Sequence, residues 1–246
     1  MGTATRISSS GPSREGPLRR TVRAVRESPG AVELSYFHIL WIFILASVVG
    51  LVVETLVSYP VDGAWKSRVG LIWGPFSPIY GLGAVLFTVT LNRLDRAPAP
   101  VVFAAAAVVG AAFEFAAGYF WEHAFGIVAW SYLDQPFNLL GYTSLGMAIV
   151  WGAAGLAWSR AVPHVVRLID RIPRGWRGWT TVALTVFLTA DVAMTFLGFA
   201  CWFDRLEGNE PQGIVQEYFA EHYDDEFMEG RFETMSMWPV LADLRG

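Results

Sequence analysis

The stretch LSYFHILWIFILASVVGLVVETLV, residues 34–57, decides the class of fold because its 24 residues contain no Lys or Arg. A bilayer core about 30 Å thick is crossed by a helix of about 20 apolar residues. The apolar segment of a secretory signal peptide has only roughly 7–15 residues and precedes a small-residue cleavage site, whereas this stretch runs into Ser58-Tyr59-Pro60. We therefore predict a retained transmembrane helix.

The composition of the whole chain has the same character, with 54% hydrophobic and 16% charged residues among 246. Soluble domains carry about 25% charged residues, so the composition predicts an integral membrane protein in contact with the lipid bilayer. The net charge of −4 and the scattered basic residues argue against nucleic-acid binding. The single cysteine, Cys201, excludes an internal disulfide and a cysteine-based metal cluster, and no cofactor or metal is expected.

Four further apolar runs have the length of a membrane span. They cover residues 71–91, 100–121, 139–158 and 179–203. Only helices and closed barrels satisfy their backbone hydrogen bonds in lipid, and these runs lack the alternation of barrel strands. The sequence therefore predicts an all-α, polytopic membrane protein with about five transmembrane helices.

Three regions follow from this pattern: a disordered basic cytoplasmic tail at 1–33, a transmembrane domain at 34–203 and an acidic extracytoplasmic tail at 204–246. The N-terminal side of the predicted spans has 13 Lys and Arg residues and the opposite side has five. Because positive residues favour the cytoplasm, we predict a multi-pass protein of the cell membrane with a cytoplasmic N-terminus and an extracytoplasmic C-terminus. A short amphipathic helix is expected near 214–228, either solvated on the surface or bound to an interface or a partner.

An internal repeat is visible at an offset of 60 residues. The sequence ASVVG at 46–50 lies over AAVVG at 106–110, and in both copies a Glu follows the Gly by four residues and a Tyr follows the Glu by five. We predict two helical hairpins in parallel orientation plus a fifth helix; such repeats place functional residues at their interface. Coincidence within a shared membrane composition is the alternative.

Glu54 and Glu114 are the sharpest candidates for a functional site because both fall at membrane depth. A charged side chain there costs about 2.5–3.5 kcal/mol on insertion scales and faces protein or water. If the repeat brings the two carboxylates together, they share a proton, bind a cation or pair with Arg68 in the first loop. A proton or ion relay and a structural clamp both fit this pattern. Asp191, in the fifth predicted helix, is a third such acid without an evident partner in the sequence.

The loops before the second and fourth predicted helices add aromatic and polar candidates: Tyr80 in the first, and Trp130, Tyr132 and Asn138 in the second. Two prolines in the first loop leave backbone carbonyls free, which is tolerated at membrane depth only where the segment is buried in protein or lines a cavity. An interfacial aromatic belt is the alternative for the tryptophans. Together with the two glutamates and Arg68, these four residues form the predicted solute or ion site.

Several catalytic motifs are missing from the sequence. It contains no G-x-x-x-x-G-K-[ST], no H-E-x-x-H and no G-x-S-x-G. The chain is therefore not a P-loop ATPase, and no enzyme class is favoured.

Two segments, 67–83 and 125–141, resemble a known bacterial family. The first contains WGPFSPIYGLG and the second contains a Trp, a Tyr and then Pro-Phe-Asn before Gly. Both are similar to the family of ABC-transporter type IV proteins (CmpB-like permeases), and the resemblance extends over residues 36–200. It implies a permease subunit that works with a separate cytoplasmic ATPase subunit.

The chain departs from the family pattern at three places. Ser131 stands where an Asp is expected, Val69 is inserted after Arg68, and Tyr142 replaces an Arg. These changes remove one acid and one base together, as the loss of a salt bridge would. More weight therefore falls on the two glutamates and on Arg68.

The resulting prediction is a divergent family member, a permease subunit that moves an unidentified solute across the cell membrane. Its polar cluster is expected to open outward between the two hairpins; the members are Glu54, Arg68, Glu114, Tyr132 and Asn138. Two alternatives stay open: a membrane enzyme or accessory factor acting on a lipid or envelope precursor, and a structural or sensory membrane subunit. Homo-oligomerisation also stays open.

Overall fold

The computed structural model describes residues 32–234 and 236–237, so the predicted disordered tail lies almost wholly outside the described residues. The chain is helical with four two-residue strands among the described residues, which confirms the all-α prediction. The helices are α2 (Tyr36–Asp62), α3 (Pro78–Leu91), η1 (Asn92–Leu94), α4 (Ala99–Phe125), α5 (Leu145–Ile169), α6 (Arg174–Leu206), α7 (Gly213–His222) and α8 (Asp225–Arg231). The strands are β1 (Ile127–Val128), β2 (Asn138–Leu139), β3 (Thr143–Ser144) and β4 (Ser236–Met237).

Four of these helices, α2, α4, α5 and α6, are long and apolar enough to cross a membrane. The expected span at 71–91 is only partly helical, because α3 begins at Pro78 and has 14 residues. At a rise of 1.5 Å per residue this helix is about 21 Å long, shorter than a bilayer core of about 30 Å. Proline lacks an amide hydrogen and disfavours helix in the residue before it, so the segment before Pro78 adopts an irregular path.

The predicted run at 139–158 is displaced in the structure. Its helix, α5, begins only at Leu145, because the preceding residues form an antiparallel pair of strands, β2 and β3. Ser144 then caps the helix by accepting a hydrogen bond from the Met147 amide at 3.2 Å. The helix continues past Pro163 to Ile169.

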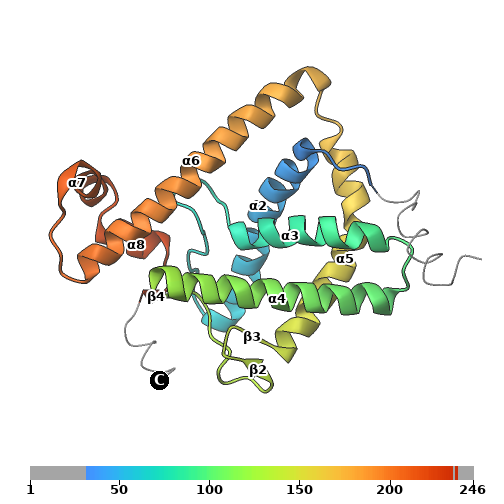
Figure 1. Cartoon of the computed structure of the whole chain (residues 1–246), viewed down its shortest axis with the longest axis horizontal. Helices are drawn as coiled ribbons and strands as arrows, with labels where there is room; N and C mark the ends of the chain where they lie inside the picture. The colour runs from blue at the N-terminus through green and yellow to red at the C-terminus, as the bar shows by residue number, and fades with distance from the viewer. Residues whose placement is uncertain (1–31, 235, 238–246) are drawn as a thin grey trace, which may run out of the picture.

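The long helices pack into a bundle, and the short helices α7 and α8 lie at one end of α6 (Figure 1). Helix α2 packs against α3, and α4 packs against α5, while α6 crosses the outside of the bundle. Small residues allow the close approach: a side chain at Gly50 would collide with Tyr80, and one at Gly110 would collide with Trp151. Two helical hairpins with buried glycine contacts are thus present; the duplication itself stays a prediction.

The predicted amphipathic helix at 214–228 is two short helices that meet at Tyr223 and Asp224. Asp224 caps α8 by accepting a hydrogen bond from the Phe227 amide at 2.8 Å. Phe219 of α7 and Met228 of α8 pack against the end of α6, at 2% and 0% exposure, whereas Ile214 at 87% and Phe227 at 40% are exposed. Its own chain therefore covers part of the apolar side of this section, and the choice between a solvated surface helix and an interface-binding or partner-binding helix stays open.

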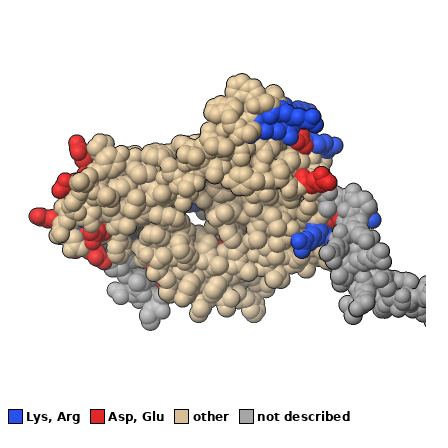
Figure 2. Space-filling view, turned by 45° about the horizontal axis from the view of Figure 1, so that its top comes forward, with Lys and Arg blue, Asp and Glu red and all other residues tan. Residues whose placement is uncertain are grey.

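Charged side chains are nearly absent from the middle of the face drawn in Figure 2. On the face drawn in Figure 2, the Lys and Arg side chains lie at one end and the Asp and Glu side chains lie mostly at the other. The belt between them carries exposed aliphatic side chains, such as Val108 on α4 and Val182 and Val186 on α6. An apolar belt between two charged ends is the surface that a membrane protein presents to lipid.

Candidate functional site

Glu54 forms the first half of the site with a residue from the following loop. Its Oε1 lies 3.1 Å from Nη1 of Arg68, and both side chains are partly buried. Tyr80, near the start of α3, interacts electrostatically with both of them. The turn between α2 and α3 therefore brings an acid, a base and a phenol together, and Arg68 is paired with Glu54.

Glu114 forms the second half on α4, and its side chain is only 3% exposed. The Tyr132 hydroxyl donates to Oε1 at 2.9 Å, and the Thr143 hydroxyl donates to Oε2 at 2.7 Å. The Trp151 ring packs on Gly110, one helical turn before the carboxylate. In the described part of the chain, neutral hydroxyls rather than a cation hold both oxygens of this carboxylate.

The two halves lie close enough to interact. Tyr132 interacts electrostatically with Glu54 as well as with Glu114, and Tyr80 interacts with Tyr132. Burial raises the pKa of Tyr132, and the charge of Glu114 raises it further, so this phenol keeps its proton and remains a donor. We refer to the following six residues as the carboxylate cluster: Glu54, Arg68, Tyr80, Glu114, Tyr132 and Thr143.

The other two predicted site residues, Trp130 and Asn138, form hydrogen bonds within their own loop. The Asn138 amide group donates to the carbonyls of Gln135 at 2.8 Å and Leu133 at 3.3 Å, and its Oδ1 accepts from the Gly141 amide at 3.1 Å. The indole of Trp130 donates to a backbone carbonyl in the same loop at 2.9 Å. Their polar atoms therefore hold the loop that carries Tyr132.

Asp191 has a partner that the sequence does not reveal. Residues 70–77, named here the proline segment, pass beside α6, where Asp191 is 0% exposed. The Trp73 amide donates to Oδ1 of Asp191 at 2.9 Å, and the Ile72 amide donates to the Thr195 hydroxyl at 2.9 Å. Asp191 and Thr195, one helical turn apart on α6, thus accept hydrogen bonds from two consecutive amides of the proline segment.

The carbonyls of the proline segment are held by Arg231 at the end of α8. Its Nε and Nη2 donate to the Leu71 carbonyl at 3.1 and 2.9 Å, and Nη2 also donates to the Gly74 carbonyl. Burial lowers the pKa of Arg231, and the charge of Asp191 opposes that effect. Two carbonyls of the segment thus have a partner within the protein, as an irregular backbone at membrane depth requires.

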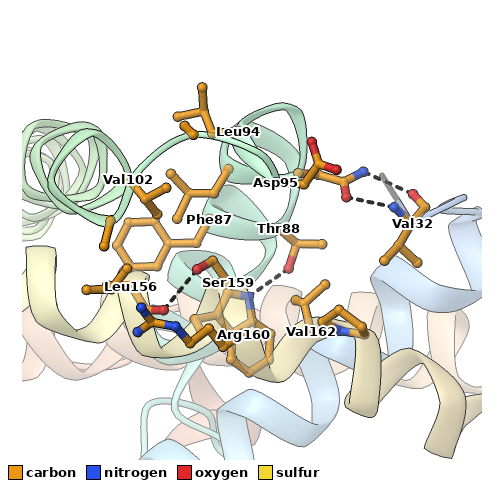
Figure 3. A pocket seen from close by; sticks show the side chains of 16 residues that line it. Val32, Phe87, Thr88, Leu94, Asp95, Val102, Leu156, Ser159, Arg160 and Val162 are labelled. Carbon is orange, nitrogen blue, oxygen red and sulfur yellow. Dashed lines mark hydrogen bonds between the residues drawn. The ribbon is translucent and has the colours of Figure 1, made fainter. Parts of the chain in front are cut away.

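A pocket of about 330 Å³ lies at the opposite end of the bundle, where α3, η1 and α4 meet α5. In Figure 3, Arg160 and Asp95 lie on opposite sides of its lining, and the Trp158 indole donates to the Thr88 hydroxyl at 2.9 Å. Asn92 holds the chain entering α2 through two hydrogen bonds with the backbone of Val32, at 2.9 and 3.0 Å. The side chains of Thr88, Asn92 and Trp158 in this lining are thus already hydrogen-bonded.

These features define an α-helical integral membrane protein with a polar cluster inside its helix bundle. The chain belongs to the family described as Putative ABC-transporter type IV, whose model matches residues 41–196, more than half of the chain. Neither the curated proteins nor the solved structures give a match. Family membership and four helices of spanning length support the interpretation that the chain is a component of a membrane transporter. The proline segment and the loop carrying Tyr132 both fall inside the matched region, whereas Arg231 falls outside it.

Proposed function

We propose that the chain is the permease subunit of an ABC-type transporter and that its carboxylate cluster binds a positively charged group of the solute or a coupling cation. The observation that carries the proposal is the excess of acid in the cluster. Its six members include two acids, Glu54 and Glu114, and one base, Arg68, which pairs with Glu54. When both carboxylates are ionised, the cluster therefore has one unbalanced negative charge.

The environment of Glu114 makes a cation a favourable addition. A buried charge is costly unless an opposite charge and hydrogen bonds offset the loss of hydration. Its two oxygens receive hydroxyl hydrogen bonds from Tyr132 and Thr143, which leave the charge itself uncompensated. A cationic group that enters the cluster supplies the missing charge, and a proton does the same in its absence.

The predicted repeat gives the cluster a place in a transport cycle. Each carboxylate comes from the first helix of one hairpin, α2 or α4, and the two hairpins meet near it. In transporters built from parallel repeats, the solute site lies at the repeat interface, and rocking of one half against the other alternates its access. The same movement here would open the cluster to one side of the membrane at a time.

Energy from ATP would have to enter from a separate subunit, because this sequence contains no P-loop. We place this ATPase on the basic turn between α5 and α6, with the N-terminus cytoplasmic and the C-terminus extracytoplasmic. Arg171 lies in the turn, and Arg174 and Arg177 lie at the start of α6. An excess of Arg and Lys favours the cytoplasm.

The partner is tested by photo-crosslinking in native membranes. A photoreactive amino acid in place of Arg174 is expected to capture a nucleotide-binding ATPase, while the same amino acid in place of Glu217 on α7, at the other end, is expected to capture none. Capture of the ATPase from position 217 alone would show that the orientation in the membrane is opposite to the proposed one. Capture of no ATPase from either position would contradict the ABC-type mechanism.

Transport is tested with the captured ATPase and the full chain in proteoliposomes. ATP-dependent uptake is measured for a panel of labelled cations, neutral solutes and anions. The variants Glu54→Gln and Glu114→Gln are expected to abolish uptake of the cation that the native chain transports, and Glu217→Gln is expected to leave it unchanged. Full transport by both cluster variants would contradict the proposed role.

A further inference from the structure

A cavity of about 560 Å³ lies beside the carboxylate cluster, between α3, α4 and α6. Aromatic and aliphatic side chains line most of it, among them Phe43, Phe113, Trp121 and Phe196. Sites for small ligands have volumes of about 300–1,000 Å³ and are mostly apolar. The volume of this cavity falls within that range.

The cavity opens toward the lipid-facing belt. Three of its lining residues are exposed on the outside of the bundle, namely Leu82 at 50% and Phe120 at 48%, together with Ala116. Other lining residues are almost inaccessible, with Leu71 at 3% and Thr195 at 2%. The lining therefore runs from the belt, where lipid chains lie, to the proline segment in the interior.

The floor of the cavity offers little to a polar ligand. Ser77 and Thr195 carry the hydroxyl groups of the lining. Thr195 accepts from the Ile72 amide at 2.9 Å and donates to the Asp191 carbonyl at 2.7 Å, so its hydroxyl is already engaged on both sides. Apolar cavities of this kind stay free of water.

We propose that this cavity binds an acyl chain of a bilayer phospholipid. An empty apolar cavity leaves its wall without packing partners, and the cost rises with its volume. The mouth between Leu82 and Phe120 lies on the belt, so hydrocarbon chains are the neighbours that can enter. The bound chain contacts the proline segment at Leu71 and packs on α4 at Phe113 and Ala117.

The test is photolabelling of the purified full chain in phosphatidylcholine vesicles that contain a small fraction of phosphatidylcholine with a diazirine in one acyl chain. Mass spectrometry of the irradiated protein then locates the adducts. Adducts on Leu71 and Thr195, which lipid surrounding the protein cannot reach, are the expected result. Adducts confined to Leu82, Phe120 and other exposed belt residues would overturn the proposal, since they report surrounding lipid alone.

Filling the cavity provides the matched variant. Ala117→Trp places a ring in the cavity and is expected to abolish the interior adducts. Val108→Trp, on the exposed side of the same helix, is expected to retain them. Should Ala117→Trp fail to fold, Ala117→Leu is the smaller filler, with helical content by circular dichroism as the folding check. Equal interior labelling of a folded filler and of Val108→Trp would contradict the proposal, as would crosslinks showing a second copy of the chain in the cavity.

Discussion

The contact between Arg231 and the proline segment gives a prediction with a magnitude. Arg231 donates three hydrogen bonds to the carbonyls of Leu71 and Gly74, and Leu71 is only 3% exposed. A hydrogen bond from a charged donor contributes about 1.5–3 kcal/mol, and a buried acceptor left without a partner costs about 1–3 kcal/mol. Arg231→Met keeps much of the apolar stem and removes every donor. We expect local opening of the proline segment to become easier by about 3 kcal/mol.

The amides of Ile72 and Trp73 report this opening, because Thr195 and Asp191 hold them in the closed state. In the regime where hydrogen exchange follows the opening equilibrium, about 3 kcal/mol corresponds to roughly a hundredfold faster exchange. The assay is hydrogen–deuterium exchange with mass spectrometry on the full chain in lipid nanodiscs, read on peptides that cover residues 70–77.

The matched control is Arg96→Met, which removes an exposed arginine from the turn between α3 and α4. It is expected to leave the exchange of residues 70–77 unchanged. If Arg231→Met also leaves it unchanged, or if both variants accelerate it equally, Arg231 does not hold the proline segment and the reasoning is refuted.

Three further substitutions probe other contacts. Thr143→Val removes the donor to Glu114 Oε2 and should lower the free energy of unfolding by about 1–3 kcal/mol in a denaturant titration. Gly110→Leu drives a side chain into Trp151 and should cost at least about 1–3 kcal/mol in the same assay. Asp170 has a pKa below its ordinary 3.8, chiefly because His38 hydrogen-bonds to it. Its contribution to stability is therefore present above pH 3.8 and lost as the pH falls further, so Asp170→Asn should destabilise at pH 7 and converge with the native chain in acid.

Each of these substitutions has a control at an open or exposed position. Gly175→Leu meets open space, Thr189→Val removes only an exposed hydroxyl bonded within its own helix, and Asp95→Asn removes an exposed acid. A control that loses as much stability as its partner would show that the named contact is not the cause. For Asp170→Asn, an equal loss of stability at pH 7 and in strong acid would contradict the dependence of stability on the ionisation of Asp170.

The sequence predicts the long helices well where hydropathy alone decides. Residues 34–57 and 100–121 are mostly apolar, and they lie within or nearly within α2 and α4. It fails at 71–91 because hydropathy does not register that proline interrupts the helix, so an apolar run becomes half irregular chain and half helix. Hydropathy indicates whether a segment is apolar enough to lie in the membrane, whereas its backbone conformation depends on single residues such as proline.

The site shows the same division. Glu54 and Arg68 are 14 residues apart, and a short loop between two helices is enough to predict their proximity. Thr143 lies 29 residues from Glu114, and Arg231 lies 160 residues from Leu71. Those contacts depend on how the second loop and the C-terminal helices pack, which local pattern does not determine. The sequence identifies the buried acids Glu114 and Asp191, but their hydrogen-bond partners can be found only after the packing is known.

The central claim is that the carboxylate cluster binds a positively charged group, and a ligand panel on the purified chain tests it most directly. Thermal unfolding is measured with sodium, putrescine, arginine, glucose, glutamate and phosphate, because a ligand that binds only the folded state raises the melting temperature. We predict that a cationic member stabilises the native chain and the control Glu217→Gln, and that Glu114→Gln abolishes this stabilisation. Stabilisation by an anion instead, or a cation effect that survives Glu114→Gln unchanged, would contradict the account.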